Sequence, residues 1–220
     1  MKTKEIIIES LDDKIEEIRH SVGLPKSEAK IAIEIGKECK PFLEAINYDV
    51  FNFLLYRGIG SRDADFFTAN VKLDNRKPKD IPQHAHNLLN DYFTEQFGEP
   101  FRNSLFTSHS YSDASEYGNV YAIFPKGKFT FCWSSKYSDL LDLWRKFSLG
   151  VDSQSDNVDK NFMDNVADGD YQTSNLQKAI ESNNEIMIRC QSAFAFNAYI
   201  VENELSIKQM NAMIQIMRMI

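Results

Sequence analysis

Residues 101–118, FRNSLFTSHSYSDASEYG, contain the strand end on which the fold prediction rests. The pattern predicts a short strand over residues 105–108, then a polar turn and a helix that starts at residues 113–114. Side chains of a strand alternate with a period of two, so Ser108 and Ser110 are expected on one face, pointing at one ligand. Serine also ends strands for turn reasons alone, so this stretch by itself does not establish a function.

Two other predicted strands carry side chains suited to a ligand at their ends. Residues 51–56, FNFLLY, indicate a buried strand that stops at Arg57 and Gly58, a cation followed by a residue that lets backbone approach a ligand closely. Residues 183–188, NNEIMI, predict a turn that runs into a strand with the carboxylate of Glu185 at its first position. An Arg, a Ser and a Glu are therefore expected at the edges of three separate strands.

This ordered set resembles the mono-ADP-ribosyltransferases of the Arg-Ser-Glu class. In that family an Arg on the first strand, a Phe-x-Ser-x-Ser segment and a Glu that opens a later strand line one NAD cleft. The matching residues here are Arg57, FTSHS at residues 106–110 and EIMI at residues 185–188. The resemblance covers roughly residues 50–201. It implies an α+β fold in which a split pair of antiparallel sheets surrounds the NAD cleft, with N-terminal helices and a C-terminal helix.

The resemblance also implies a role for each matching residue. Arg57 would hold the diphosphate of NAD, since a guanidinium binds phosphate through two parallel hydrogen bonds and keeps its charge. The backbone at Gly58 would reach the nicotinamide amide, and Ser108 would orient the nicotinamide ribose. Glu185 would stabilise the positive charge that develops when the bond between ribose and nicotinamide breaks.

Three further residues complete the predicted site. Ser110 is expected to bind NAD beside Ser108, and Phe129 to stack on a ring of NAD, although aromatic residues in such strands are more often core. Asn183 would contact the acceptor. It occupies the position where family members that modify arginine have a second Glu, and an amide is nearer to members that modify other side chains. The sequence therefore leaves the acceptor side chain open.

Two functions follow as alternatives. The first is an NAD-dependent mono-ADP-ribosyltransferase of bacterial or phage effector type, which transfers ADP-ribose from NAD to a macromolecular acceptor, expected to be protein, and releases nicotinamide. The second is a non-catalytic interaction or virion structural protein that retains the fold. No metal is expected, because His84 and His86 would point about 200° apart on a helix.

Composition limits the other functional classes. The chain has 220 residues with 43% hydrophobic residues, and 16 Phe and 9 Tyr favour a packed domain. Its formal charge of −7 disfavours nucleic acid as a partner. Three scattered cysteines favour free thiols in a reducing compartment. No secretory or membrane-spanning segment is predicted, so a cytoplasmic location is expected, in the host cell if a phage encodes the protein.

Hydrophobic periodicity predicts a helical extension over residues 1–49, and the resemblance implies an ADP-ribosyltransferase-like domain over residues 50–220. Helices are predicted over residues 11–19, 27–46, 80–97, 139–147, 173–182 and 207–220, with Pro41 kinking or splitting the second. Their expected N-caps include Ser27, Asp80, Ser138 or Asp139, and Ser206.

The remaining segments are predicted as strands and loops. Residues 120–124 and 129–133 are expected to form a hairpin with Gly127 in its turn, and residues 194–201 a final strand. Residues 61–79 read as a solvated loop, or else as a loop from which one cation meets a phosphate. Residues 152–170 read as a flexible acidic loop, since the spacing of a calcium loop is not met.

Overall fold

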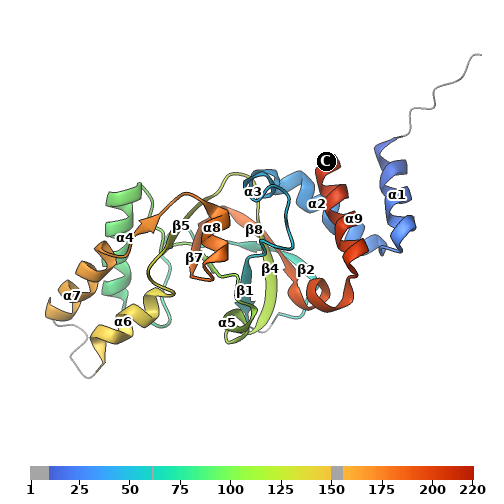
Figure 1. Ribbon diagram of the computed structural model, residues 1–220. Helices are drawn as coiled ribbons and strands as arrows, with labels where there is room; N and C mark the ends of the chain where they lie inside the picture. Colours follow the sequence, from blue (N-terminus) through green and yellow to red (C-terminus); the bar gives the residue numbers. More distant parts are fainter. Residues whose placement is uncertain (1–9, 61, 150–155) are drawn as a thin grey trace, which may run out of the picture.

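The computed structural model describes residues 10–60, 62–149 and 156–220. Two four-stranded antiparallel sheets lie in the middle of an elongated molecule, with helices at both ends (Figure 1). The fold is therefore α+β, as predicted. Within the described residues, none of the helices has both the length and the apolar character that crossing a membrane requires.

The two sheets are built from strands far apart in the sequence. The first has the order β1-β4-β8-β2 and comprises β1 (Tyr56–Ile59), β4 (Asn119–Pro125), β8 (Ser192–Asn197) and β2 (Phe66–Asn70). The second has the order β3-β7-β5-β6 and comprises β3 (Leu105–Thr107), β7 (Ile186–Arg189), β5 (Thr130–Ser134) and β6 (Tyr171–Gln172). The sheets meet at an antiparallel bridge between Tyr56 and Ser108. The Tyr56 N–H donates to the Ser108 carbonyl at 2.6 Å, and the Ser108 N–H donates back at 3.1 Å.

Helices form two groups, one at each end of the molecule (Figure 1). One end has α1 (Leu11–Val22), α2 (Lys26–Glu38), α3 (Lys40–Ala45) and the C-terminal α9 (Ile207–Met219). The other end has α4 (Gln83–Phe97), α6 (Leu140–Ser148) and α7 (Asp156–Ala167). Short helices α5 (Tyr111–Ser115) and α8 (Leu176–Glu181) contact β1 and β5, and a π-helix, Ile200–Glu204, follows β8.

Several helix boundaries follow their predicted signals. The predicted helix is split at Cys39, with Pro41 in the first turn of α3, and Asp139 caps α6 through the Leu141 N–H. Ser206 starts α9 with a capping box completed by Gln209. The predicted caps Ser27 and Asp80 are wrong, because α2 and α4 begin directly after prolines.

Two hydrophobic clusters occupy opposite faces of the second sheet, because strand side chains alternate. Ile186 and Ile188 of β7 join the cluster that includes the first sheet, α2 and α9, whereas Met187 joins the cluster of α4, α6 and α7. The helices before residue 50 thus share a core with β4, β8 and the C-terminal helix. The three cysteines are buried and free, as predicted, and burial raises the pKa of Cys190 to about 11.

Three predicted strands differ from the structure. The buried run at residues 51–55 precedes β1 rather than forming it, so Arg57 and Gly58 lie inside the strand. The predicted hairpin is wrong: β4 pairs with β1 and β8, whereas β5 pairs with β6 and β7. The turn at Gly127, with φ of 63°, carries the chain from one sheet to the other. The final strand ends at Asn197, before the π-helix.

Two segments predicted as loops contain regular structure. The polar segment 61–79 contains the edge strand β2, which pairs with β8. Residues 156–167 form α7 because Val158, Phe162 and Val166, spaced four residues apart, are buried in the second cluster. Burial of this stripe outweighs the acidic composition. Residues 152–155 of the predicted flexible loop lie outside the described residues.

Candidate functional site

The three residues of the motif converge where the two sheets meet. Arg57 follows Tyr56 in β1, and Tyr56 bridges to Ser108 at the end of β3. In the neighbouring strand pair Thr107 lies opposite Ile186, so the next residues along, Ser108 and Glu185, lie across from one another. The strand pairing therefore brings together three backbone segments that are distant in sequence, and Arg57 and Glu185 are close enough to interact electrostatically.

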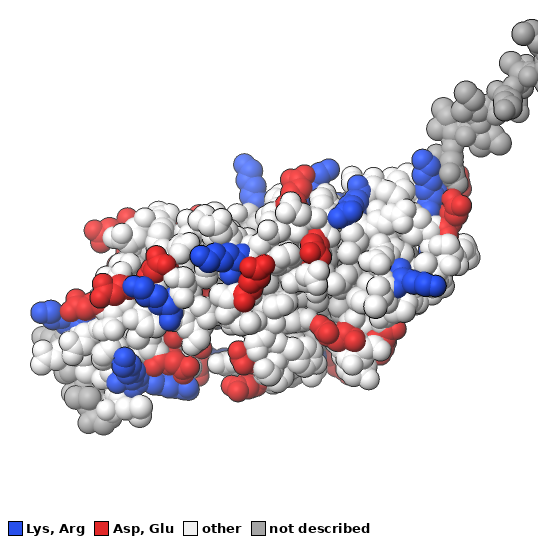
Figure 2. Space-filling model, viewed as in Figure 1, with Lys and Arg blue, Asp and Glu red and all other residues white. Residues whose placement is uncertain are grey.

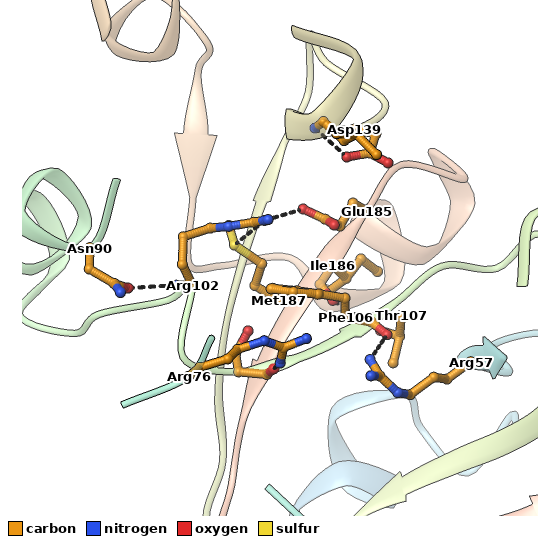
Figure 3. A network of polar contacts seen from close by, with 12 residues as sticks. Arg57, Arg76, Asn90, Arg102, Phe106, Thr107, Asp139, Glu185, Ile186 and Met187 are labelled. Atoms are coloured by element: carbon orange, nitrogen blue, oxygen red, sulfur yellow. Dashed lines mark hydrogen bonds and ion pairs between the residues drawn. The ribbon is translucent and has the colours of Figure 1, made fainter. Parts of the chain in front are cut away.

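Arg57 is half-buried and directed toward β3 (Figure 3). Its Nη1 donates to the Phe106 carbonyl at 2.8 Å. Burial lowers the pKa of the Arg57 guanidinium, and the nearby carboxylate of Glu185 opposes this effect. The Arg57 guanidinium is thus a positive charge close to Glu185. One of its nitrogens is held in place by the Phe106 carbonyl of β3.

Glu185 is paired with a buried cation, Arg102. Arg102 Nη1 donates to Glu185 Oε1 at 2.8 Å, and the two side chains are 7% and 18% exposed, respectively. The Glu185 N–H donates to the Ser138 carbonyl at 2.7 Å, which fixes the start of β7 against the segment before α6. Burial raises the pKa of Glu185, Arg102 lowers it, and the neighbouring Asp139 carboxylate raises it further.

Sequence reasoning missed Arg102 and gave no particular role to Arg76. Both guanidinium groups stack on Phe106, with the Arg76 and Arg102 carbons 4.1 Å and 4.3 Å from the ring centroid. Figure 3 shows them on opposite sides of the ring. Arg102 stands in the quoted segment only a few residues before β3, but no local pattern shows that it faces Glu185. The contact of Arg76 depends on the path of the segment after β2.

The serine pair is not arranged as predicted, because the chain turns after Ser108. The Ser110 hydroxyl accepts from the Asp113 N–H at 3.2 Å and so caps α5. Ser108 Oγ donates to the Ser110 carbonyl and accepts from the Ser110 N–H, both at 3.3 Å. Ser108 therefore stays at the strand end beside Glu185, whereas Ser110 belongs to the helix start. The intervening His109 bonds the Leu54 carbonyl through Nδ1 at 2.7 Å.

Gly58 and Phe129 serve the fold rather than the group around Glu185. A Cβ on Gly58 would lie 2.0 Å from the Ala114 carbonyl oxygen, so α5, not a ligand, fills the space beside this glycine. Phe129 lies beyond Thr130, at the end of β5 opposite to the end near Glu185. There it contacts Phe42 and Phe131, with ring centroids 6.0 Å and 6.3 Å away.

Asn183 lies in the turn two residues before Glu185, and its side chain is exposed. Its φ of 58° is in the left-handed region, which asparagine tolerates better than most residues. The turn therefore explains this residue by itself, and contact with an acceptor stays a prediction. The next residue, Asn184, is tied down through its side-chain amide, which donates to the Ser134 carbonyl at 2.9 Å.

Histidines and acids do not gather into a metal site in the described part of the chain, where no group of three or more metal-binding side chains occurs. His84 contacts Asp159 at 3.1 Å, and His86 contacts Asn103 at 3.1 Å. The two imidazoles thus have different partners on different segments.

Two surface hollows lie away from Glu185. One is lined by residues 47–49 and α9, the other by residues 174–178, α8 and Phe131. Neither is lined by Arg57, Ser108 or Glu185, so an NAD cleft at the motif stays a prediction. Comparison with family models, curated proteins and solved structures gives no match to this chain.

Proposed function

We propose that this protein is an NAD-dependent mono-ADP-ribosyltransferase. The observation that supports the proposal is the convergence of Arg57, Ser108 and Glu185 at the junction of the two sheets. The bridge between Tyr56 and Ser108 and the pairing of β3 with β7 support it, because they bring the segments that carry these three residues to one junction. Two antiparallel sheets joined at this point are also consistent with an ADP-ribosyltransferase-like fold.

The chemistry assigns one task to each group. The bond between the nicotinamide nitrogen and C1 of the ribose breaks, and nicotinamide leaves with the bonding electrons. The ribose passes through an oxocarbenium-like state, and C1 then bonds to the acceptor nucleophile, which loses its proton to solvent. Glu185 stabilises the developing positive charge, and Ser108 orients the ribose. Arg57 offers its remaining N–H groups to the diphosphate.

Glu185 must be ionised for this task, and its surroundings determine whether it is. Burial favours the neutral acid, whereas Arg102 favours the carboxylate through a hydrogen bond and its charge. Arg102 therefore acts as a positioning residue: it orients Glu185 and supports its ionised form. A preorganised charge of this kind is a large term in enzymatic catalysis, since it costs no reorganisation during the reaction.

The proposed acceptor is a protein. The net charge of −7 disfavours a polyanionic acceptor. On the face shown in Figure 2, Lys and Arg are interspersed with Asp and Glu and form no broad basic patch. The proposed compartment is the cytoplasm, which suits three free cysteines.

Label transfer tests the proposed function. The purified protein is incubated with cell extract and NAD labelled in its adenine half, and labelled macromolecules are then digested with protease or nuclease. We expect a label that protease releases and that is absent with Glu185→Gln. Glu181→Gln is the matched control, because Glu181 is an exposed acid at the end of α8. No labelling by either protein would favour a non-catalytic interaction or structural role, and equal labelling by Glu185→Gln and wild type would reject Glu185 as the catalytic residue.

A further inference from the structure

Phe106 lies between two guanidinium groups (Figure 3). Arg102 comes from the segment before β3 and is 6% exposed. Arg76 comes from the irregular segment between β2 and α4 and is half-buried. Planar guanidinium groups stack well on aromatic faces while their N–H edges stay free for hydrogen bonds. The stack thus holds two cations in fixed planes beside the proposed catalytic group.

Two polar side-chain atoms beside the Phe106 stack make no hydrogen bond among the described residues. In the part of the chain that the structure describes, two buried side-chain atoms have no hydrogen-bond partner, Arg102 Nε and Ser104 Oγ. Arg102 and Ser104 stand two residues apart in the segment before β3. The backbone carbonyl of Ser104 accepts a hydrogen bond from Arg76 Nη1. Leaving a buried polar atom without a partner costs on the order of 1–3 kcal/mol. Two such atoms in one short segment indicate that a partner is missing.

Positive charges around Phe106 also outnumber the negative charges close to them. Arg57 and Arg102 both lie near Arg76, and burial together with these two cations lowers the pKa of Arg76 to about 10. Glu185 offsets part of this repulsion, but its hydrogen bond is made with Arg102. Arg102 makes its hydrogen bonds to Glu185 and Met187 Sδ through Nη1. The edge of the guanidinium that carries Nε takes no part in these two contacts. An added anion would relieve the repulsion and provide the missing acceptor.

We propose that Arg76 and Arg102, stacked on Phe106, form an anion site that binds a phosphate group of the dinucleotide. The inference rests on the proposed function and adds two residues that the Arg-Ser-Glu pattern does not contain. Arg57 approaches the diphosphate from β1, and Arg76 and Arg102 approach it from the other side of β3. Arg102 Nε is buried and without a hydrogen-bond partner, and Arg76 is half-buried on the irregular segment between β2 and α4.

Inorganic pyrophosphate and ADP are the probes, with adenosine as the phosphate-free comparison. Calorimetric titration of the full-length protein is expected to show binding of both probes and none of adenosine. Arg76→Gln should weaken binding at least about tenfold, because it removes charge-assisted hydrogen bonds. Arg76→Lys, which keeps the charge but loses the planar stack, should fall in between. Arg62→Gln is the matched control: Arg62 also stacks on a phenylalanine, Phe67, at 4.2 Å, but is exposed and lies beside β2.

The outcomes separate this site from the proposed function. Pyrophosphate binding that depends on Arg76, in a protein that does not cleave NAD, would support the anion site and reject the transferase. NAD cleavage with affinities for NAD and pyrophosphate unchanged by both Arg76 variants would support the transferase and overturn the anion site. Tighter binding of a single-stranded oligonucleotide than of pyrophosphate, with the same dependence on Arg76, would overturn the dinucleotide assignment. Thermal unfolding of each variant confirms that it is folded.

Discussion

At the scale of single residues, opposing effects set the ionisation of Glu185, and together they raise its pKa. Burial stabilises the neutral acid, and the contact with Arg102 stabilises the carboxylate. The Arg102 side chain is itself almost fully enclosed, so its charge is poorly screened by water and acts strongly on its partner. The pH at which the proposed reaction begins thus depends on a residue outside the motif.

Arg102→Gln should move the acid limb of the pH–rate profile. Removing the cation removes the effect that lowers the pKa of Glu185, so this pKa rises and the carboxylate forms only at higher pH. A neighbouring Arg typically lowers a carboxyl pKa by about 1–3 units, so the limb should move up by about one unit or more. The measurement is nicotinamide release against pH. Arg145→Gln, which breaks an exposed ion pair with Asp142, should leave the limb in place, and an unmoved limb with Arg102→Gln would contradict the account.

Arg57, Ser108 and Glu185 could be singled out from sequence because each stands in a short local pattern, and their roles in a site stay predictions. Arg57 and Glu185 adjoin apolar strands, and Ser108 ends one. Arg76 and Arg102 were not predictable in the same way, because their roles come from contacts made across the fold with Phe106 and Glu185. For Ser110 and Phe129 the fold supplies another role, a helix cap and a hydrophobic contact, and their contacts with a ligand stay predictions.

Close packing of α5 on β1 is the element-scale feature that positions Arg57. The Ala114 carbonyl and Tyr117 approach Gly58 so closely that a side chain there would overlap them. Arg57 is the preceding residue, and strand side chains alternate, so α5 packs on the side of β1 away from it. A shift of α5 would therefore move the strand that carries the proposed phosphate-binding cation.

Gly58→Ala should destabilise the protein by about 1–3 kcal/mol, because the added methyl group forces β1 and α5 apart. The free energy of unfolding from denaturant titration measures this cost. Gly60→Ala is the control in the same loop and strand region, since the nearest atom to its Cβ would be 3.9 Å away. If both variants unfold at the same denaturant concentration as wild type, the close contact between β1 and α5 is not present in solution.

Element boundaries were predicted where apolar spacing and capping agree, as in α6 and α9. They were missed where pairing depends on distant strands. The edge strand β2 is only half-buried and gives little alternation, and the partners of β4 and β5 lie up to dozens of residues away. A turn with a glycine looks the same in sequence whether it joins paired strands or strands of different sheets.

At the scale of the whole molecule, the second sheet joins two hydrophobic cores. Its strands β5 and β7 send alternate side chains into each cluster, with Trp133 in one and Cys132 in the other. The helices at the two ends of the molecule therefore belong to clusters that meet opposite faces of the second sheet. Loss of packing in one core should weaken the strands that the other core needs.

Phe162→Ala tests this coupling. Phe162 of α7 is fully buried and contacts Trp144 with ring centroids 5.0 Å apart. Truncation should cost about 3–5 kcal/mol and lower the midpoint of a single thermal transition. Lys160→Ala, at an exposed position of the same helix, should leave the midpoint unchanged. Two separate transitions in calorimetry, with only one shifted by Phe162→Ala, would show instead that the two cores unfold independently.

Release of nicotinamide from NAD by the purified protein, without added acceptor, is the most direct test of the central claim. Water then replaces the acceptor, so slow cleavage is expected from wild type and from Glu181→Gln. Glu185→Gln should reduce the rate on the order of a hundredfold or more, because it removes the charge that stabilises the oxocarbenium-like state. Cleavage at equal rates by wild type and Glu185→Gln, or no cleavage by either at any pH or with added extract, would contradict the account.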